Sequence, residues 1–206
     1  MNIKIKHAVN APFPKLISKF ASVTLGTALM ALGFLLAVPC AKAQTAISMT
    51  DTNFILAAAQ GGMMEVKLGE LAVQKGLRDD VKEFGQMMVK DHTAINDDLK
   101  TLATQKGVTL PPALDAEHQD IADKMTTLKG SEFDDAYING MIQTHQKDAK
   151  AFRAESAATG DAGIKYFVNT SIPVVESHLQ QITALKNLKQ AAGSKKITAS
   201  SPITPE

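Results

Sequence analysis

The chain has 206 residues, of which 45% are hydrophobic and 5% aromatic, and it contains a single cysteine, Cys40. Its 22 basic and 21 acidic residues give a net charge of +1, which lacks the positive excess that attracts nucleic-acid phosphates. One cysteine also excludes a framework of intramolecular disulfides, so a hydrophobic core must hold the fold together.

Residues 1–43 have the pattern of a secretory signal peptide. Basic residues precede an apolar run over residues 25–38, and Ala41-Lys42-Ala43 forms a small-residue cleavage site before Gln44. This order predicts cleavage after Ala43 and export to the periplasm or the cell envelope.

Two alternatives to cleavage concern the same segment. Residues 20–39 carry no charge and are long enough for a membrane anchor, and Cys40 is a conceivable site for a lipid. The cleavage site that follows disfavours the anchor, and the proline directly before Cys40 disfavours the lipid.

Cleavage changes the charge of the chain. The leader carries five lysines and no acidic residue, so the mature protein has 17 basic and 21 acidic residues and a net charge of −4. No nucleic-acid partner is therefore expected. No transmembrane barrel is expected either, because the segments of alternating hydrophobicity that build one are absent. An envelope protein or a second copy of this chain remains as a partner.

Five helices are expected after the leader. The first begins at Ser48, where the segment to Asp51 has a capping-box pattern, and it ends at Gly76. The second begins at residues 78–80 and runs to about Lys106. Because so few residues connect them, these two helices should form an antiparallel hairpin.

Glycine and proline separate the remaining helices. The segment 107–112 breaks the helical pattern before a short helix over residues 114–128. A second capping-box pattern, Ser131 to Asp134, predicts the start of the fourth helix. Gly160 followed by Asp161 predicts its end and the N-cap of the fifth.

The helical domain is thus predicted over residues 48–190, followed by a flexible tail over residues 191–206 that has no apolar periodicity. The fold class is all-α. If the short helix carries the chain back along the bundle, the four long helices form two antiparallel hairpins in a ferritin-like four-helix bundle with a short extra connecting helix. The alternative is a plain up-down-up-down bundle.

Four polar residues lie on the apolar stripes of the four long helices, namely Glu65, His92, His145 and His178. With about 1.5 Å of rise per residue, counting from one end of the bundle puts all four within roughly 6 Å of one level. A titratable side chain aimed into a helical core needs a partner, so these residues are expected to form one cluster.

Imidazole nitrogens and a carboxylate oxygen are ligands of transition metals, so the cluster predicts a site for one ion of zinc, copper or nickel. Met88 and Met141 lie one helical turn before His92 and His145 and would offer thioether ligands to copper. The alternative is a set of hydrogen-bonded core histidines that bind no metal.

Other polar residues receive no such role. His118, on the short helix, is expected to be structural, and Asp91, Asp97 and Asp98 are expected to face solvent, with a surface cation site as a lesser alternative. The chain has no Gly-x-Ser-x-Gly motif and no phosphate-binding loop. No catalytic residue and no organic cofactor site are predicted.

Four segments carry the cluster: Glu65 with the following LGELA, VKEFGQMMVKDH ending at His92, FDDAYINGMIQTH ending at His145, and Pro173 to His178. From about Asp51 to Leu185, these segments resemble the bacterial exported proteins grouped as domain of unknown function 4142. That resemblance implies a ferritin-like fold and export, since the family has no settled activity.

Di-iron sites of ferritin-like proteins use Glu-x-x-His on two helices. Here Val89, Ile142 and Val175 stand three residues before the histidines, so an iron-storage centre is not predicted. The sequence favours a non-enzymatic, exported binding protein that holds one transition-metal ion in its core. The alternatives are a metal-dependent, oxidoreductase-like enzyme and a structural or stress-related envelope protein without metal.

Overall fold

The computed structural model describes residues 47–199, with side chains up to residue 189. Its helices are α1 (Met49–Lys75), α2 (Asp79–Lys106), α3 (Ala116–Thr127), α4 (Gly130–Ala158) and α5 (Ala162–Ala199). The predicted signal peptide and the last seven residues, 200–206, lie outside the described residues. In the part that is described, no helix is both long and apolar enough to cross a membrane.

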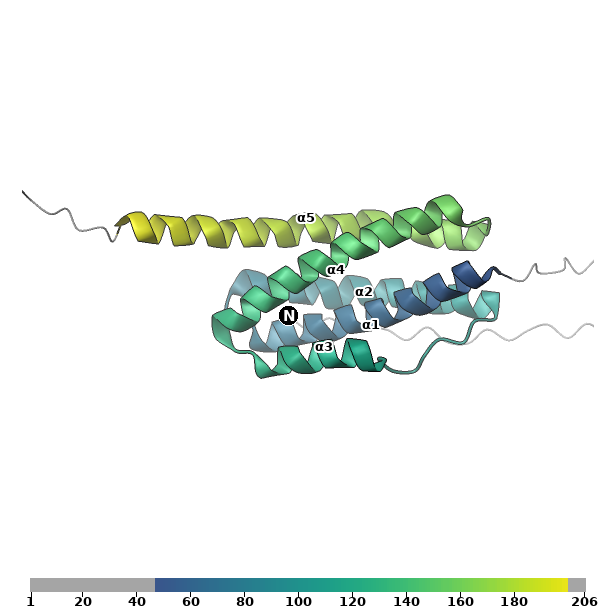
Figure 1. Cartoon of the computed structure of the whole chain (residues 1–206), viewed down its shortest axis with the longest axis horizontal. Helices are drawn as coiled ribbons and strands as arrows, with labels where there is room; N and C mark the ends of the chain where they lie inside the picture. Colours follow the sequence, from purple (N-terminus) through teal and green to yellow (C-terminus); the bar gives the residue numbers. More distant parts are fainter. Residues whose placement is uncertain (1–46, 200–206) are drawn as a thin grey trace, which may run out of the picture. The chain divides into compact units, whose positions relative to one another are not determined.

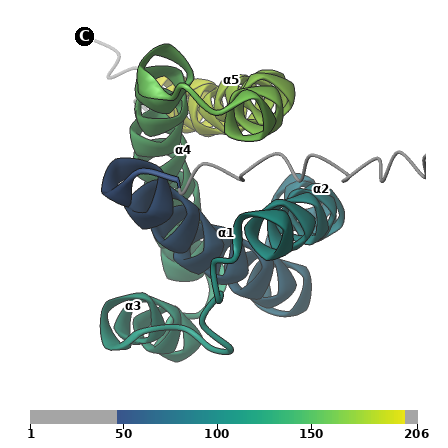
Figure 2. The same cartoon turned by 90° about the vertical axis from the view of Figure 1, so that its right-hand side faces the viewer.

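The long helices form two antiparallel hairpins, α1 with α2 and α4 with α5 (Figure 1). Helix α3 packs on the outside of α1, as the end-on view shows (Figure 2), and it returns the chain along the bundle to the end where α2 began (Figure 1). Consequently α2 and α4 run in the same direction. This is the ferritin-like arrangement that the sequence predicts, and it excludes the up-down-up-down bundle.

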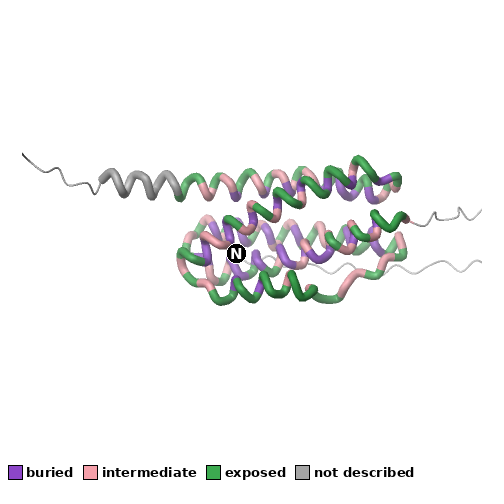
Figure 3. The backbone as a smooth tube through the Cα atoms, viewed as in Figure 1, coloured by how far each residue is buried: buried purple, intermediate pink, exposed green. Residues whose placement is uncertain are grey.

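The buried residues face inward along every long helix (Figure 3) and form two apolar clusters. One cluster contains Leu68, Met88, Tyr137 and Ile182, and the other contains Ile55, Leu99, Phe152 and Ile164. His92, His145 and His178 fall between these two clusters along their helices, and Glu65 directly follows Met64 of the first cluster. The core therefore consists of two apolar layers with a buried polar layer between them.

Helices α1 and α2 approach each other closely along one face. A Cβ atom at Gly69 would lie 2.9 Å from the carbonyl oxygen of Gly85, and a Cβ atom at Gly85 would lie 2.8 Å from that of Gly69. Side chains of any size are excluded at both positions. The two glycines therefore let the first hairpin close, which sets the spacing of the site residues on α1 and α2.

The helix starts match the sequence at two places. The backbone N–H of Asp51 donates to Ser48 Oγ at 3.0 Å and the Ser48 N–H donates to Asp51 Oδ2 at 3.3 Å, so the capping box of α1 is present. Asp161 Oδ1 accepts from the N–H groups of Gly163 and Ile164 at 2.9 and 3.0 Å. Both caps satisfy N–H groups that lack a partner inside the helix.

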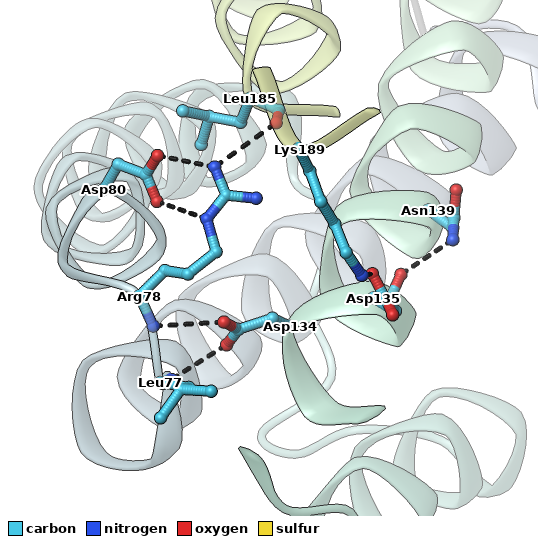
Figure 4. A network of polar contacts seen from close by, with 8 residues as sticks. All are labelled: Leu77, Arg78, Asp80, Asp134, Asp135, Asn139, Leu185 and Lys189. Atoms are coloured by element: carbon cyan, nitrogen blue, oxygen red, sulfur yellow. Dashed lines mark hydrogen bonds and ion pairs between the residues drawn. The ribbon is translucent and has the colours of Figure 1, made fainter. Parts of the chain in front are cut away.

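The capping box predicted for Ser131 and Asp134 is wrong. The N-cap of helix α4 is Lys129, two residues before Ser131, and it makes no side-chain cap. Asp134 instead accepts hydrogen bonds from the backbone N–H groups of Leu77 and Arg78, at 2.9 and 3.0 Å (Figure 4). Since the N-cap of α2, Arg78, makes no side-chain cap of its own, a carboxylate from the second hairpin caps the first.

The Arg78 side chain extends this connection between the hairpins. Its guanidinium group binds the Asp80 carboxylate and donates to the carbonyl oxygen of Leu185, at 3.3 Å, on α5. Nearby, Lys189 pairs with Asp135 and so joins α5 to α4 (Figure 4).

Helix α5 continues to Ala199, past the end expected near residue 190. The segment 191–199 contains good helix formers, mainly alanine and lysine, and the next proline is Pro202. The absence of an apolar stripe suggested a tail there, but helical backbone does not require one.

Candidate metal centre

Three histidines from three helices meet in the polar layer. The ring centroids of His92 and His145 are 5.6 Å apart, those of His92 and His178 are 5.2 Å apart, and those of His145 and His178 are 5.4 Å apart. Only 3%, 0% and 1% of the respective residues are exposed. These three residues, called the triad below, are three of the four that stripe position and helix depth predict to lie together, the fourth being Glu65.

One ring nitrogen of each triad histidine has a partner outside the triad. His92 Nδ1 lies 2.9 Å from Glu65 Oε2 on α1. His178 Nε2 lies 3.0 Å from Asp91 Oδ2 on α2. His145 Nδ1 lies 2.9 Å from the carbonyl oxygen of Met141, one turn earlier on α4.

The second ring nitrogen of each histidine is buried and has no hydrogen-bond partner: these are His92 Nε2, His145 Nε2 and His178 Nδ1. Of these, His145 Nε2 lies 3.6 Å from Glu65 Oε1, beyond hydrogen-bond distance. Carbonyl oxygens and ionised carboxylates only accept hydrogen bonds, so with Glu65 and Asp91 ionised the partnered nitrogens carry the hydrogens and the other three keep their lone pairs. The arrangement therefore presents three nitrogen lone pairs inside the core.

The spacing of the three histidines would suit a metal ion if the imidazole rings moved inward by a small distance. Each triad residue offers one nitrogen, and these nitrogens lie within 4.8 Å of one another. The centre of such a triangle is at most about 2.8 Å from each nitrogen, whereas a zinc–imidazole bond is about 2.0–2.1 Å. Binding an ion would thus draw each ring inward by at most about 0.7 Å.

Burial keeps the triad uncharged. Removal from water lowers the pKa of His92 to about 4, and it also lowers the pKa of His145 and of His178. The causes are the same for all three: burial disfavours the charged imidazolium. At neutral pH the histidines are in the unprotonated form that binds metals.

Glu65 lies beside the triad and is almost fully buried. One oxygen, Oε2, binds His92, while Oε1 lies 3.6 Å from His145 Nε2. Burial raises the pKa of Glu65 to about 7. Burial and the neighbouring Glu65 likewise raise the pKa of Asp148, which is hydrogen-bonded to Glu65, to about 7. In this geometry Glu65 orients His92, and its predicted role as a ligand stays a prediction.

Two residues beside the triad were not found by sequence reasoning. Asp91 was expected to face solvent, but its side chain is only 29% exposed and binds His178, whereas Asp97 and Asp98 are exposed as expected. Asp148 follows His145 by three residues and shares its face of α4, a spacing that could have drawn attention to it. The buried hydroxyl of Tyr137 also lacks a partner, and the Glu65 charge acts on it.

His118 lies apart from the triad on α3. Its Nδ1 is 2.7 Å from Oδ1 of Asp115, and that same oxygen caps α3 by accepting from the His118 N–H at 2.9 Å. This contact gives His118 a structural role, as the sequence suggests.

The fold and the cluster define a ferritin-like, all-α bundle whose buried histidine triad could hold a metal ion. The chain belongs to the family described as "Domain of unknown function (DUF4142)", whose model matches residues 36–185. A comparison with curated proteins found no match.

Solved structures share the fold at low sequence identity. A DUF305 fragment from Deinococcus radiodurans is 10% identical, with a TM-score of 0.60 over 68% of this chain and 96% of the fragment. CopM in the Cu(I)-bound form is 18% identical, with a TM-score of 0.57 over 68% of this chain and 97% of CopM. CopM in the Cu(II)-bound form is 19% identical, with a TM-score of 0.56 over 66% of this chain and 94% of CopM.

Proposed function

We propose that this protein is a binding protein that holds one transition-metal ion, Cu²⁺ most tightly, on the unpartnered nitrogens of His92, His145 and His178. Two observations on the same three buried histidines carry the proposal: each has a ring nitrogen without a hydrogen-bond partner, and one nitrogen of each lies within 4.8 Å of the others. Leaving a buried polar atom unpartnered costs about 1–3 kcal/mol each. A metal ion would remove all three penalties at once.

The charges around the triad support a divalent ion. Glu65 and Asp91 each place a carboxylate on a triad histidine, so two negative charges flank three neutral ligands. Such carboxylates orient metal-bound imidazoles and raise their basicity. With both ionised, they would neutralise an ion of charge +2, which is otherwise costly to bury.

Copper is favoured by the ligand type. Imidazole sites bind divalent first-row metals in an order that peaks at Cu²⁺, so Ni²⁺ and Zn²⁺ should bind more weakly. The CopM structures of the same fold, in Cu(I)-bound and Cu(II)-bound forms, add support from a distant relative.

The test is metal uptake by the purified protein. Calorimetry should show about one equivalent of Cu²⁺, and a hundredfold excess over Kd should raise the free energy of unfolding by about 2.7 kcal/mol. Electron paramagnetic resonance should show nitrogen ligands on the bound ion. His145→Ala and His178→Ala should each lose most of the uptake.

His118→Ala is the matched control, because it removes an imidazole outside the triad and should bind Cu²⁺ as the unmodified protein does. Circular dichroism of each variant must first show a cooperative helical fold. Absence of stoichiometric Cu²⁺ in the unmodified protein, or unchanged uptake by folded triad variants, would contradict the proposal and favour a structural role. Catalysed redox turnover of the copper-loaded protein would favour the enzymatic alternative.

We also propose export to the periplasm or cell envelope, on the support of the leader pattern in residues 1–43. The protein recovered from an envelope fraction should have a mass that corresponds to a start at Gln44. A retained leader, or a lipid on Cys40, would contradict this.

A further inference from the structure

A cavity of about 410 Å³ is lined both by exposed residues of the bundle and by His92, the one triad residue that it reaches. Its outer part is lined by exposed residues of the α3 region, among them Asp115 and Glu117. Its inner part is lined by the buried side chains of Glu65 and His92. Two smaller cavities, of about 280 and 260 Å³, contain no triad residue and no Glu65.

Acidic side chains outnumber basic ones along this cavity, which favours a cation: Glu65, Asp115, Glu117 and Asp148 line it, against Lys147. Asp115 and Glu117 lie at the outer end. At the inner end, Glu65 Oε1 lies 3.6 Å from His145 Nε2, and Asn96 Oδ1 has no hydrogen-bond partner. Asn96 follows His92 by one turn of α2, and its Oδ1 lies against Gly62 of α1. Acceptor oxygens at the inner end of an otherwise largely apolar passage can replace part of the hydration shell of an arriving ion.

Gly61 leaves part of the cavity wall open. It lies within α1 and lines the cavity, and a Cβ atom built on it would meet no atom within 4 Å. A glycine inside a helix costs about 1 kcal/mol relative to alanine. Here the missing side chain keeps space free between the surface and the inner oxygens.

We propose that this cavity is the route by which a metal ion reaches and leaves the triad, with Glu65 Oε1 and Asn96 Oδ1 as transient ligands on the way. The inference rests on the proposed metal binding at the triad. It adds a path and an order of contacts: surface carboxylates, inner oxygens, then His92.

The test narrows the cavity without touching the triad. A series of Gly61→Ala, Gly61→Leu and Gly61→Phe adds side chains of increasing size where the structure has free space. Each also replaces a helical glycine with a better helix former, so the variants should fold. Stopped-flow quenching of tyrosine fluorescence by Cu²⁺ gives the association rate, since the chain has no tryptophan. Transfer of Cu²⁺ to excess EDTA gives the dissociation rate.

Both rates should fall together as the side chain grows, by about tenfold or more for Gly61→Phe, while Kd stays within about threefold. Gly140→Leu is the matched control. Gly140 is also half-buried inside a helix with no atom within 4 Å of a built Cβ, but it does not line the cavity. The association and dissociation rates of Cu²⁺ in the Gly140→Leu variant should equal those of the unmodified protein.

Unchanged rates throughout the Gly61 series would overturn the proposed route, as would a change in Kd with an unchanged association rate. An equal slowing in Gly140→Leu would overturn it as well. None of these results resembles a failure of metal binding itself, in which the unmodified protein would take up no Cu²⁺ at equilibrium.

Discussion

Replacing Glu65 with glutamine should stabilise the metal-free protein at pH 8. Burial raises the pKa of Glu65 from 4.5 to about 7. A carboxyl group whose pKa is raised on folding contributes stability below its unfolded pKa, and this contribution is lost as the pH rises through the folded value. At about 1.4 kcal/mol per pKa unit, ionised Glu65 costs up to about 3 kcal/mol at pH 8.

Glutamine keeps the size of the side chain and removes this cost. Asp148 is hydrogen-bonded to Glu65, and that neighbour raises its pKa. Part of the free-energy cost of ionisation therefore arises from the interaction of the two carboxyl groups. The expected gain at pH 8 is therefore about 1–3 kcal/mol, and it should disappear near pH 4.5, where Glu65 is protonated in the folded protein. Urea unfolding at the two pH values measures it.

The same substitution should weaken Cu²⁺ binding by about 10–100-fold, because it removes the carboxylate that orients His92 and balances the charge of the ion. The substitution should also remove the pH dependence of Cu²⁺ affinity that Glu65 causes below pH 7. In the unmodified protein the ion must displace the Glu65 proton below pH 7, so affinity should fall about tenfold per pH unit there. His92, whose pKa is about 4, competes only at lower pH.

Glu155→Gln is the matched control. Glu155 is also buried on α4, ten residues beyond His145, and burial and the neighbouring Asp51 raise its pKa to about 7. It should show the same sign of pH-dependent stabilisation with unchanged Cu²⁺ affinity by calorimetry. A Glu65→Gln variant that is less stable than the unmodified protein at pH 8, or that binds Cu²⁺ equally well, would refute the reasoning.

Three further outcomes are expected. Asp134→Ala should lower the free energy of unfolding, measured in urea, by about 3–5 kcal/mol, because two charge-assisted hydrogen bonds to the start of α2 are lost. Asp135→Ala breaks an exposed ion pair and should cost less than about 1 kcal/mol. Equal effects of the two substitutions would contradict the capping of α2 by Asp134. Asp91→Asn should weaken Cu²⁺ binding about 10–100-fold by calorimetry through its contact with His178, and an unchanged Kd would remove Asp91 from the site. Circular dichroism of residues 44–206 should show one helical melting transition that is insensitive to reductant, since the only cysteine is Cys40.

The helices and their arrangement could be predicted because the signals are local. Gly76, Gly107 and the Gly160-Asp161 pair interrupt strong apolar stripes, and the structure ends or starts a helix at each. The ferritin-like order followed from the length of the segment between α2 and α4, which is long enough for a crossover. Such features depend on a few neighbouring residues, which a single sequence shows.

Tertiary partners were harder to predict. Ser131 to Asp134 matches a capping box, yet Asp134 binds backbone N–H groups 56 and 57 residues earlier in the chain. Asp91 directly precedes His92 but binds His178, 87 residues away. A sequence pattern gives the face of a helix to which a side chain belongs, but the partner across the interface depends on rotamers and helix spacing.

Within the candidate site, the positions of the histidines could be predicted from the sequence, but the hydrogen-bonding state of each ring nitrogen could not. Stripe and depth put His92, His145 and His178 at one level because both follow from helix geometry. Which ring nitrogen stays free depends on the contacts of Glu65, Asp91 and the Met141 carbonyl group, and these appear only in the folded chain. Metal ligation remains a prediction.

The triad is divided unequally between the two hairpins: α2 supplies one histidine, and α4 and α5 supply two. Each hairpin makes most of its contacts within itself, so separation of the hairpins is an available mode of opening. An ion on all three nitrogens would act as a cross-link between two otherwise distinct cooperative units. Metal binding would then slow the hydrogen exchange of amides far from the triad, because the two hairpins could no longer open independently of each other.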